Sequence, residues 1–407
     1  MPGRAIACPF CGLVCDDLLL DEGRVDTRGC AKGAAGFARR PAIVEHRING
    51  RAASLGEAAA AAAGLLGAAR LPLVTGLAAD VAGLRALVGL ADRLGAVIDR
   101  WQSAAQQTNL SLLQRAGALA ATFAEIANRA DVVLLIGNDP TPSQPRFFER
   151  LLRNRGALYR QAPPYVAFLG PEAAMPGDAA VSERVPVNED ALLDALSALA
   201  ALGEGRKLAA SASLPLVALG ELADRLATAH YGAVVWDIAA FPPAARAPAL
   251  AILLRMMRRL ARRTRCVGLP LGGEDNAQGA AQVMLWQAGW PGRLSFAGGV
   301  PQHDPWRNHA QRLLAAGEAD ALLWVAALSA APAPECGVPT VALLAADAPA
   351  ARAEVEIRVG IPGLDHGGAV MRADTVVALP LAPARPSGLP SVAAAARAIL
   401  AHLLATP

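Results

Sequence analysis

Short aliphatic runs alternate with helical stretches along most of the chain. The first runs lie at residues 71–75, 96–99, 131–136 and 165–169, and helical patterns at residues 84–94, 110–117 and 146–154 separate them. Strands that alternate with helices are typical of a parallel sheet with both faces covered. The pattern therefore predicts an α/β fold built on parallel sheets.

The pattern is interrupted around residues 204–214, where Gly203, Gly205, Lys207 and Ser211 suggest a boundary. A second alternating set follows at residues 233–238, 249–263, 266–271 and 294–296, and a third at residues 321–325, 340–344 and 355–359. We expect the third set to return to the first sheet. The predicted organisation is an α/β domain at residues 53–203 and 318–407, with an inserted α/β domain at residues 204–317.

Residues 1–52 have a different character, with many charges and no long apolar run. A short hairpin is expected at residues 17–26, around the turn Asp21-Glu22-Gly23, and the first long helix is expected to begin at Ser54 with Glu57 three residues later. This N-terminal module is too small to bury much core, so a bound metal centre would supply folding energy.

The module contains Cys8, Cys11, Cys15 and Cys30, and the next cysteine is Cys266. Four thiolates at these spacings could ligate one 4Fe-4S cluster, which is the interpretation we favour. Structural zinc is an alternative, although paired C-x2-C hairpins are its usual pattern. Free thiols are the third alternative. Lys32 would place a positive charge beside the centre.

Composition narrows the classes of function. The chain has 407 residues, 54% hydrophobic but 4% aromatic, and a net charge of +3, too weak to indicate nucleic-acid binding. No secretory signal and no membrane span are recognised, so we expect a cytoplasmic protein, where clustered cysteines are metal ligands or redox groups more often than disulfides. The arginines at residues 255–265 are expected to form the exposed side of an amphipathic helix.

Two polar stretches are candidate cofactor-binding sites. Ligands of open α/β sheets bind beyond the carboxyl ends of strands, and an ordinary turn is the alternative in each case. The candidates are Gly137, Asn138, Asp139, Pro140 and Arg146 after the run at 131–136, and Asn276, Gln278 and Gly279 before the tryptophans Trp286 and Trp290. No hydrolase, kinase or zincin motif is present, and no catalytic residue is predicted.

Taken together, these features resemble the B subunit of formylmethanofuran dehydrogenase, a member of the molybdopterin oxidoreductase superfamily. Cys8-Pro9-Phe10-Cys11-Gly12-Leu13-Val14-Cys15 is similar to the family's cluster motif, and Gly29-Cys30-Ala31-Lys32-Gly33 to its closing cysteine. Residues 91–99, 129–146 and 276–305 are similar to later family blocks. The resemblance implies molybdopterin-oxidoreductase-like parallel sheets, a 4Fe-4S module and an inserted α/β domain.

One departure from the family is informative. The dehydrogenase ligates tungsten or molybdenum through a cysteine just after the strand that ends here at Asp99, whereas residues 100–105 contain none. Without that soft ligand, no tungsten or molybdenum pterin is expected. The resemblance then points to the bacterial formyltransferase/hydrolase complex, which transfers a formyl group between tetrahydromethanopterin and a methanofuran-type carrier and releases formate.

The resemblance implies that this chain is a scaffold for the other subunits and holds the carrier's anionic tail, for which Arg146 and the arginines at residues 255–265 offer positive charge. Two other functions stay open at this point. One is a redox catalytic subunit of a tungsten or molybdenum formylmethanofuran dehydrogenase, in which Ser103 or solvent replaces the thiolate. The other is an electron relay that uses only the cluster.

Overall fold

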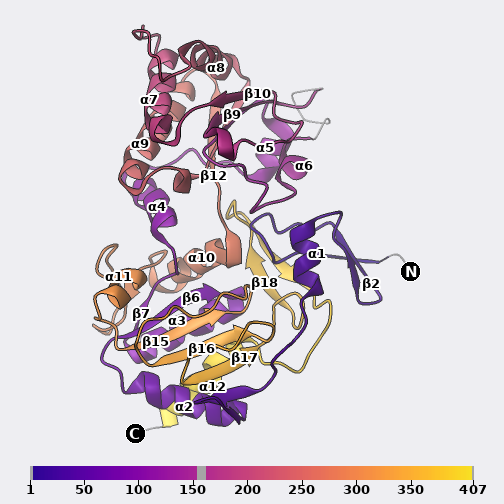
Figure 1. Ribbon diagram of the computed structural model, residues 1–407, viewed down its shortest axis with the longest axis vertical. Helices are drawn as coiled ribbons and strands as arrows, with labels where there is room; N and C mark the ends of the chain where they lie inside the picture. Colours follow the sequence, from indigo (N-terminus) through magenta and orange to yellow (C-terminus); the bar gives the residue numbers. More distant parts are fainter. Residues whose placement is uncertain (1–2, 154–161, 406–407) are drawn as a thin grey trace. The chain divides into compact units, whose positions relative to one another are not determined.

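The computed structural model describes residues 3–153 and 162–405. It consists of two compact units (Figure 1). Unit 1 is formed by Met1–Ser103 and Gly273–Pro407, and unit 2 by Ala104–Gly272. The chain therefore leaves unit 1 once, builds a second α/β unit and returns.

Unit 1 is built on a nine-stranded sheet. Its five central strands, β7, β6, β15, β16 and β17, are parallel. The edge strands β13, β14, β4 and β5 pair antiparallel. In spatial order the strands are β14 (Gln302–His303), β13 (Leu294–Ser295), β7 (Val97–Ile98), β6 (Pro72–Ala78), β15 (Ala321–Ala326), β16 (Thr340–Ala345), β17 (Val355–Val359), β4 (His46–Ile48) and β5 (Arg51–Ala53).

Helices cover this sheet because alternate residues of each strand point to opposite faces. Val74 joins the larger core cluster, whereas its neighbour Leu73 joins the cluster on the other face. The larger cluster is formed with α2 (Leu55–Gly67), α3 (Val81–Leu94), α10 (Ala277–Ala288) and α12 (Val392–Ala405), and the other with α11 (Ala310–Ala315). The predicted start of α2 is confirmed, since Ser54 and Glu57 form a reciprocal capping box.

Two small antiparallel sheets complete unit 1. The first contains β1 (Arg4–Ile6), β2 (Leu18–Asp21) and β3 (Arg24–Asp26), and the helix α1 (Ala31–Ala38) follows it. Its β2–β3 pair is the predicted hairpin. The second sheet contains β18 (Gly368–Met371) and β19 (Ala378–Leu381). A short 3-10 helix, η4 (Glu274–Asn276), leads into α10.

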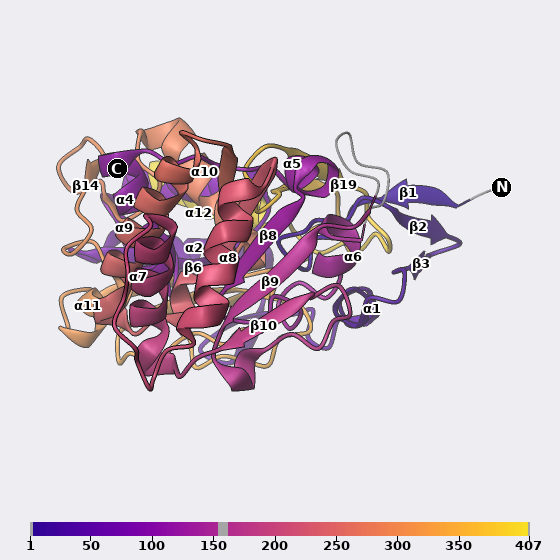
Figure 2. The same cartoon turned by 90° about the horizontal axis from the view of Figure 1, so that it is seen from above.

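Unit 2 is built on a five-stranded, all-parallel sheet in the order β10 (Glu183–Pro186), β9 (Tyr165–Gly170), β8 (Val132–Ile136), β11 (Tyr231–Trp236), β12 (Arg265–Pro270). Figure 2 shows α7 and α8 beside β8, β9 and β10. Its helices are α4 (Ala104–Ala116), α5 (Phe123–Arg129), α6 (Phe147–Leu151), α7 (Leu192–Gly203), α8 (Leu216–Thr228) and α9 (Pro243–Leu260), with 3-10 helices η1 (Glu172–Ala174), η2 (Glu189–Ala191) and η3 (Ile238–Ala240).

The observed division of the chain differs from the predicted one. β6 pairs with β15, so the third set of strands does return to the first sheet as expected. However, β8 and β9 pair with β11 and not with β6, so they belong to unit 2, and β13 pairs with β7 in unit 1. The excursion spans residues 104–272 instead of 204–317. The patternless stretch 204–214 is a surface connection between α7 and α8.

Two further expectations can be compared with the structure. The module predicted at residues 1–52 ends earlier, because β4 and β5 join the edge of the large sheet through β17. The helix expected at residues 146–154 is observed as α6, and Asn154 lies outside the described residues. Among the helices of residues 3–153 and 162–405, none is long and apolar enough to cross a membrane.

Candidate functional site

The loop between β1 and β2 carries three of the four clustered cysteines. It folds back on itself, because the Cys8 N–H donates to the Cys15 carbonyl (2.9 Å) and the Val14 N–H to the Cys11 carbonyl (3.1 Å). Val14 takes a positive φ of 43° to close this turn. The three thiols are buried in consequence.

Cys30 is brought to the loop by α1, which it caps. The Gly33 N–H donates to the Cys30 Sγ at 3.3 Å. The Phe10 ring lies directly on Gly36, where a Cβ would overlap it, and meets the Phe37 ring edge-on at a centroid distance of 5.0 Å. The aromatic contact therefore fixes α1 against the cysteine loop.

The thiols share one environment. Burial raises the pKa of Cys8 far above its usual range, and the charges of Cys11, Cys15 and Cys30 raise it further. Burial also raises the pKa of Cys11, and the nearby Lys32 ammonium opposes that rise. Without a bound metal the thiols of Cys8 and Cys11 are protonated and unreactive at neutral pH, since the thiolate is the nucleophile and the ligand.

The four cysteines, as the structure places them, do not form a site for a single metal ion. Within residues 3–153 and 162–405, no three His, Cys, Asp or Glu side chains are arranged so that they could hold one metal ion. The donor chemistry of the four thiols fits a cluster, whose several metal atoms hold the ligands further apart than one ion does.

A chain of charges extends from the cysteine loop. Lys32 pairs with Glu274 (Nζ to Oε1, 2.6 Å), as expected for a positive charge beside the thiols. Burial raises the pKa of Asp275, the next residue, and Arg100 and Lys32 oppose the rise. Burial lowers the pKa of Arg100, and Asp275 opposes that fall. Charged side chains of both signs thus extend from the cysteine loop to the carboxyl end of β7, with the like charges of Glu274 and Asp275 next to each other.

At that end of β7, Asp99, Ser103 and Arg293 form a buried cluster. Asp99 accepts hydrogen bonds from the Ala310 N–H (3.0 Å) and the Ser103 hydroxyl (3.2 Å). The Ser103 hydroxyl also accepts from Arg293, at 3.1 Å from Nη2 and 3.4 Å from Nε. Arg293 further donates to the Pro305 carbonyl and lies 3.8 Å from Asp99. The one oxygen that could replace the missing thiolate is therefore held by protein partners.

This cluster includes residues that the sequence analysis missed. Arg293 has a positive φ of 50°, and the neighbouring His309 has a buried Nε2 without a hydrogen-bond partner in the described part of the chain. Burial lowers the pKa of His309, and Arg293 lowers it further. An aspartate directly after a buried strand, as Asp99 is, was the signal available in the sequence.

Asn276, predicted to bind a cofactor, joins the start of α10 to the end of β6 and to β18. It adopts a left-handed conformation (φ 58°) at the start of α10 and is 3% exposed. Its Nδ2 donates to the Ala79 carbonyl after β6, and its Oδ1 accepts from the Met371 N–H in β18, both at 2.8 Å. Gly279 lies against this amide, where a Cβ would overlap it, and Gln278 is half-buried. The contacts of Asn276 and Gly279 give both residues a structural role.

The other predicted group lies in unit 2, after β8. Gly137 has a φ of 105°, and Asn138 donates to Asp237, at the end of β11 (2.8 Å). Asp139 accepts from both the N–H and the hydroxyl of Thr141. Pro140 accepts from the Gln144 N–H (2.8 Å). The strand end is thus an ordered polar turn.

Arg146, predicted to meet an anion, is 5% exposed and is paired with Glu149. Its Nε lies 2.9 Å and its Nη2 2.5 Å from the two carboxylate oxygens. A ligand would have to compete with Glu149 for this guanidinium. Binding of a carrier tail by Arg146 stays a prediction that this geometry does not favour.

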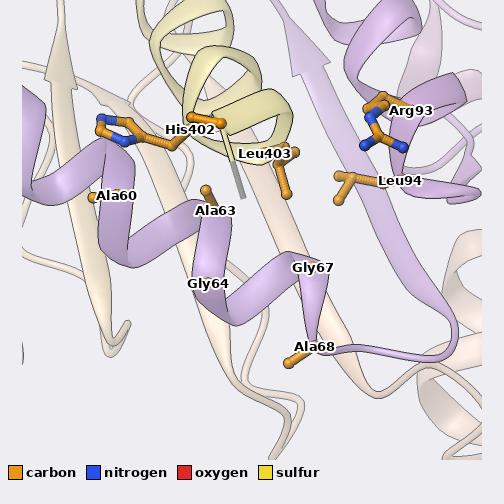
Figure 3. Close-up of a pocket in the computed structure, with 10 residues that line it drawn as sticks. Ala60, Ala63, Gly64, Gly67, Ala68, Arg93, Leu94, His402 and Leu403 are labelled. Atoms are coloured by element: carbon orange, nitrogen blue, oxygen red, sulfur yellow. The ribbon is translucent and has the colours of Figure 1, made fainter. Parts of the chain in front are cut away.

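A separate groove of about 570 Å³ lies in unit 1 between α2, α3 and α12. Figure 3 shows Gly64 and Gly67 of α2 on one side and Leu403 of α12 on the other, with Arg93 and His402 at its margins. None of the candidate residues lines it. A stripe of small residues is ordinary helix packing, so we assign no function to this groove.

Comparison with known proteins places these features in context. No family model matches the chain. It is 35% identical to the Fhc B subunit of the formyltransferase/hydrolase complex of Methylorubrum extorquens over 341 residues, covering 79% of this chain and 87% of the relative. It is 27% identical over 403 residues to the B subunit of the tungsten-containing formylmethanofuran dehydrogenase 2 of Methanocaldococcus jannaschii, covering 92% of each chain.

A solved structure agrees with the sequence comparison. The X-ray crystal structure of the formyltransferase/hydrolase complex (FhcABCD) from Methylorubrum extorquens in complex with methylofuran contains a similar chain, with a TM-score of 0.75 and 31% identity. The similarity covers 88% of this chain and 99% of that chain. The mixed α/β fold with parallel sheets is therefore shared with that structure.

We predict that Gly279→Ala destabilises the protein by about 2–4 kcal/mol, because the added methyl group displaces Asn276 from its two buried hydrogen bonds. The control is Gly89→Ala in α3, an exposed helix glycine with open space around its Cβ position. That change should stabilise the protein by about 0.5–1 kcal/mol. Denaturant unfolding measures both, and equal effects would refute the role of Asn276.

A second prediction concerns Asp99. Burial raises its pKa from 3.8 to about 6, although the Ala310 N–H, Arg293 and the Ser103 hydroxyl each lower it. Because the folded-state pKa lies above the unfolded-state value, the stabilisation is fully present below about pH 4 and is lost as pH rises through about 6. The free energy of unfolding of the native protein should therefore fall, relative to that of Asp99→Asn, by about 1.4 kcal/mol between about pH 5 and about pH 7.5.

The control for Asp99 is Asp92→Asn, which removes an exposed carboxyl from α3. Denaturant unfolding at several pH values gives the difference between each variant and the native protein. A pH-independent difference for Asp99→Asn would show that Arg293 keeps the carboxyl ionised throughout, and the prediction would be wrong.

Proposed function

The chain belongs to the family of the Fhc B subunit, and from this we propose that it is the B subunit of a formyltransferase/hydrolase complex. Its role there is to assemble the other subunits and to bind a methanofuran-type formyl carrier, without redox catalysis of its own. The similarity to the FhcABCD chain over most of both lengths supports membership of such a complex. Carrier binding is supported only by the methylofuran of that complex.

The non-redox role is supported chiefly by the residues that follow β7. Residues 100–105 contain no thiolate, and the hydroxyl of Ser103 is engaged by Asp99 and Arg293. A tungsten or molybdenum ion would have to break this buried network to reach an oxygen ligand, and a serine oxygen is a poorer ligand than a thiolate for such an ion. These residues therefore do not fit a metal-pterin cofactor.

The scaffold role is supported by exposed aromatic side chains. Three of the six tryptophans, Trp286, Trp290 and Trp306, are 56%, 42% and 68% exposed. Trp290 stacks on His303 at 4.9 Å, and Arg312 lies over the Trp306 ring at 4.4 Å. Tryptophan and arginine dominate the energetics of protein interfaces, and exposed tryptophans are unusual in a chain with 4% aromatic residues.

We predict that Trp286→Ala combined with Trp306→Ala weakens association with the other subunits by about thirtyfold or more, as for the loss of interface anchors. The control, Val376→Ala, removes apolar surface that is 58% exposed elsewhere in unit 1. Affinity is measured by titrating the purified chain into the remaining subunits. Unchanged affinity would mean that the tryptophans face solvent in the complex.

The N-terminal module is part of the same proposal. Cys8, Cys11, Cys15 and Cys30 would hold a 4Fe-4S cluster, and support comes from the burial of Cys8, Cys11 and Cys15, from the electrostatic influence of the other three thiols on Cys8, and from the Gly33 N–H directed at Cys30. When bound, such a cluster would supply a one-electron centre. In a chain without a metal-pterin its contribution is folding energy for a module with little core.

We predict about four iron atoms per chain after anaerobic purification, with tungsten and molybdenum below stoichiometric levels. Cys11→Ser should lower the iron content and the stability of the N-terminal module together. Cys336→Ser, which changes a half-buried thiol outside the module, should do neither. Elemental analysis also distinguishes the alternatives: one zinc per chain supports a structural ion, no metal supports free thiols, and stoichiometric tungsten or molybdenum restores the dehydrogenase interpretation.

A further inference from the structure

The C-terminal end of α9 and the residues after it present a dense arginine surface. Six arginines, Arg255, Arg258, Arg259, Arg262, Arg263 and Arg265, lie within eleven residues, and all six are exposed. Arg258 donates to the carbonyls of Ala116 and Gly117, and Arg259 pairs with Glu204. Among the described residues the other four have no carboxylate partner. The amphipathic-helix interpretation explains their exposure and leaves this excess charge unexplained.

The same helix end borders a cavity of about 270 Å³ between α7, α8 and α9. The side chains of Leu199, Leu226, Met256 and Leu260 line its apolar part, and Arg259, Arg262 and Arg263 lie at its margin. The cavity combines an apolar lining with the guanidinium groups of Arg262 and Arg263, which have no carboxylate partner among the described residues, and so it offers two kinds of recognition. The apolar lining accepts an aliphatic side chain, and the guanidinium groups accept carboxylates.

Glu204 is the carboxylate among the residues that line this cavity. It is neutralised from two sides, because one oxygen lies 3.0 Å from Arg259 and the other 3.0 Å from Arg206. Its side chain is only 11% exposed. Glu204 therefore orients Arg259 and does not cancel the charge of Arg262 and Arg263.

We propose that this cavity docks an acidic segment of a partner subunit, with an aliphatic side chain in the cavity and flanking carboxylates paired with Arg262 and Arg263. The identification of the partner as a subunit rests on the function proposed above. The charge argues against a second copy, which would bring the same arginines. The cavity lining contains no aromatic residue, whereas nucleic-acid grooves stack bases on aromatic rings.

The test uses the full chain titrated into the purified A, C and D subunits. Arg262→Glu combined with Arg263→Glu should weaken association by about tenfold or more, and the affinity that remains should depend less on salt. The matched control, Arg51→Glu with Arg397→Glu, makes the same change in net charge at two exposed positions of unit 1. It should leave association unchanged.

A second variant tests the apolar part without any change in charge. Ala227→Leu extends a half-buried side chain into the cavity and should weaken association while the unfolding transition stays cooperative. A labelled peptide of alternating Glu and Leu should compete with the subunits. A peptide of alternating Glu and Ser should compete less well, because it cannot fill the cavity.

The possible failures are distinguishable. If the native chain does not associate with the A, C and D subunits, the proposed function fails. If it associates and the Arg262/Arg263 variant associates equally well, the docking proposal is wrong and the proposed function stands. Tighter binding of a single-stranded oligonucleotide than of the Glu-Leu peptide would also overturn the proposal, in favour of nucleic acid.

Discussion

The pairing of β6 with β15 is the constraint on which unit 1 depends. It joins two stretches of chain separated by the whole of unit 2, and Asp320 reinforces it by accepting from the N–H groups of Arg70 and Leu71 where β6 begins. Three contacts of unit 1 span the same junction: Lys32 meets Glu274, Ala79 meets Asn276, and Asp99 meets Arg293. These contacts cannot form before the distant segments meet, so their geometry reports on the completed fold.

The carboxyl end of β7 carries a buried polar cluster, and residues 100–105 after it contain no thiolate. Charged side chains continue from Lys32 through Asp275 and Arg100 to Asp99 and Arg293. Buried charges are costly unless they are paired, so removing Asp99 or Arg293 would leave the other without its partner. Asp99 and Arg293 also occupy the hydroxyl of Ser103, which leaves it no spare bonding capacity for a metal.

Local features were predictable from the sequence, and pairings between distant segments were not. The cysteine spacing, the β2–β3 hairpin and the Ser54 capping box all follow from residues that are close in the chain. Alternation of strands and helices gave the α/β class. It could not assign β8 and β9 to a sheet, because a buried parallel strand has the same apolar composition whichever neighbour it pairs with. The structural role of Asn276 was not predictable for a related reason, since a buried structural amide and a ligand-binding amide look alike until their partners, here Ala79 and Met371, are known.

The two surfaces that remain without partners differ in chemistry, and this difference fits a subunit that assembles several others. The exposed tryptophans of unit 1 offer rigid apolar area, which gains energy from desolvation and is insensitive to salt. The arginine margin of unit 2 offers charge, which governs encounter rate and partner choice and weakens with ionic strength. Because each unit carries its own kind of surface, the two contacts can be lost independently. A salt titration of the assembled complex should therefore release contacts made through unit 2 before those made through the tryptophans.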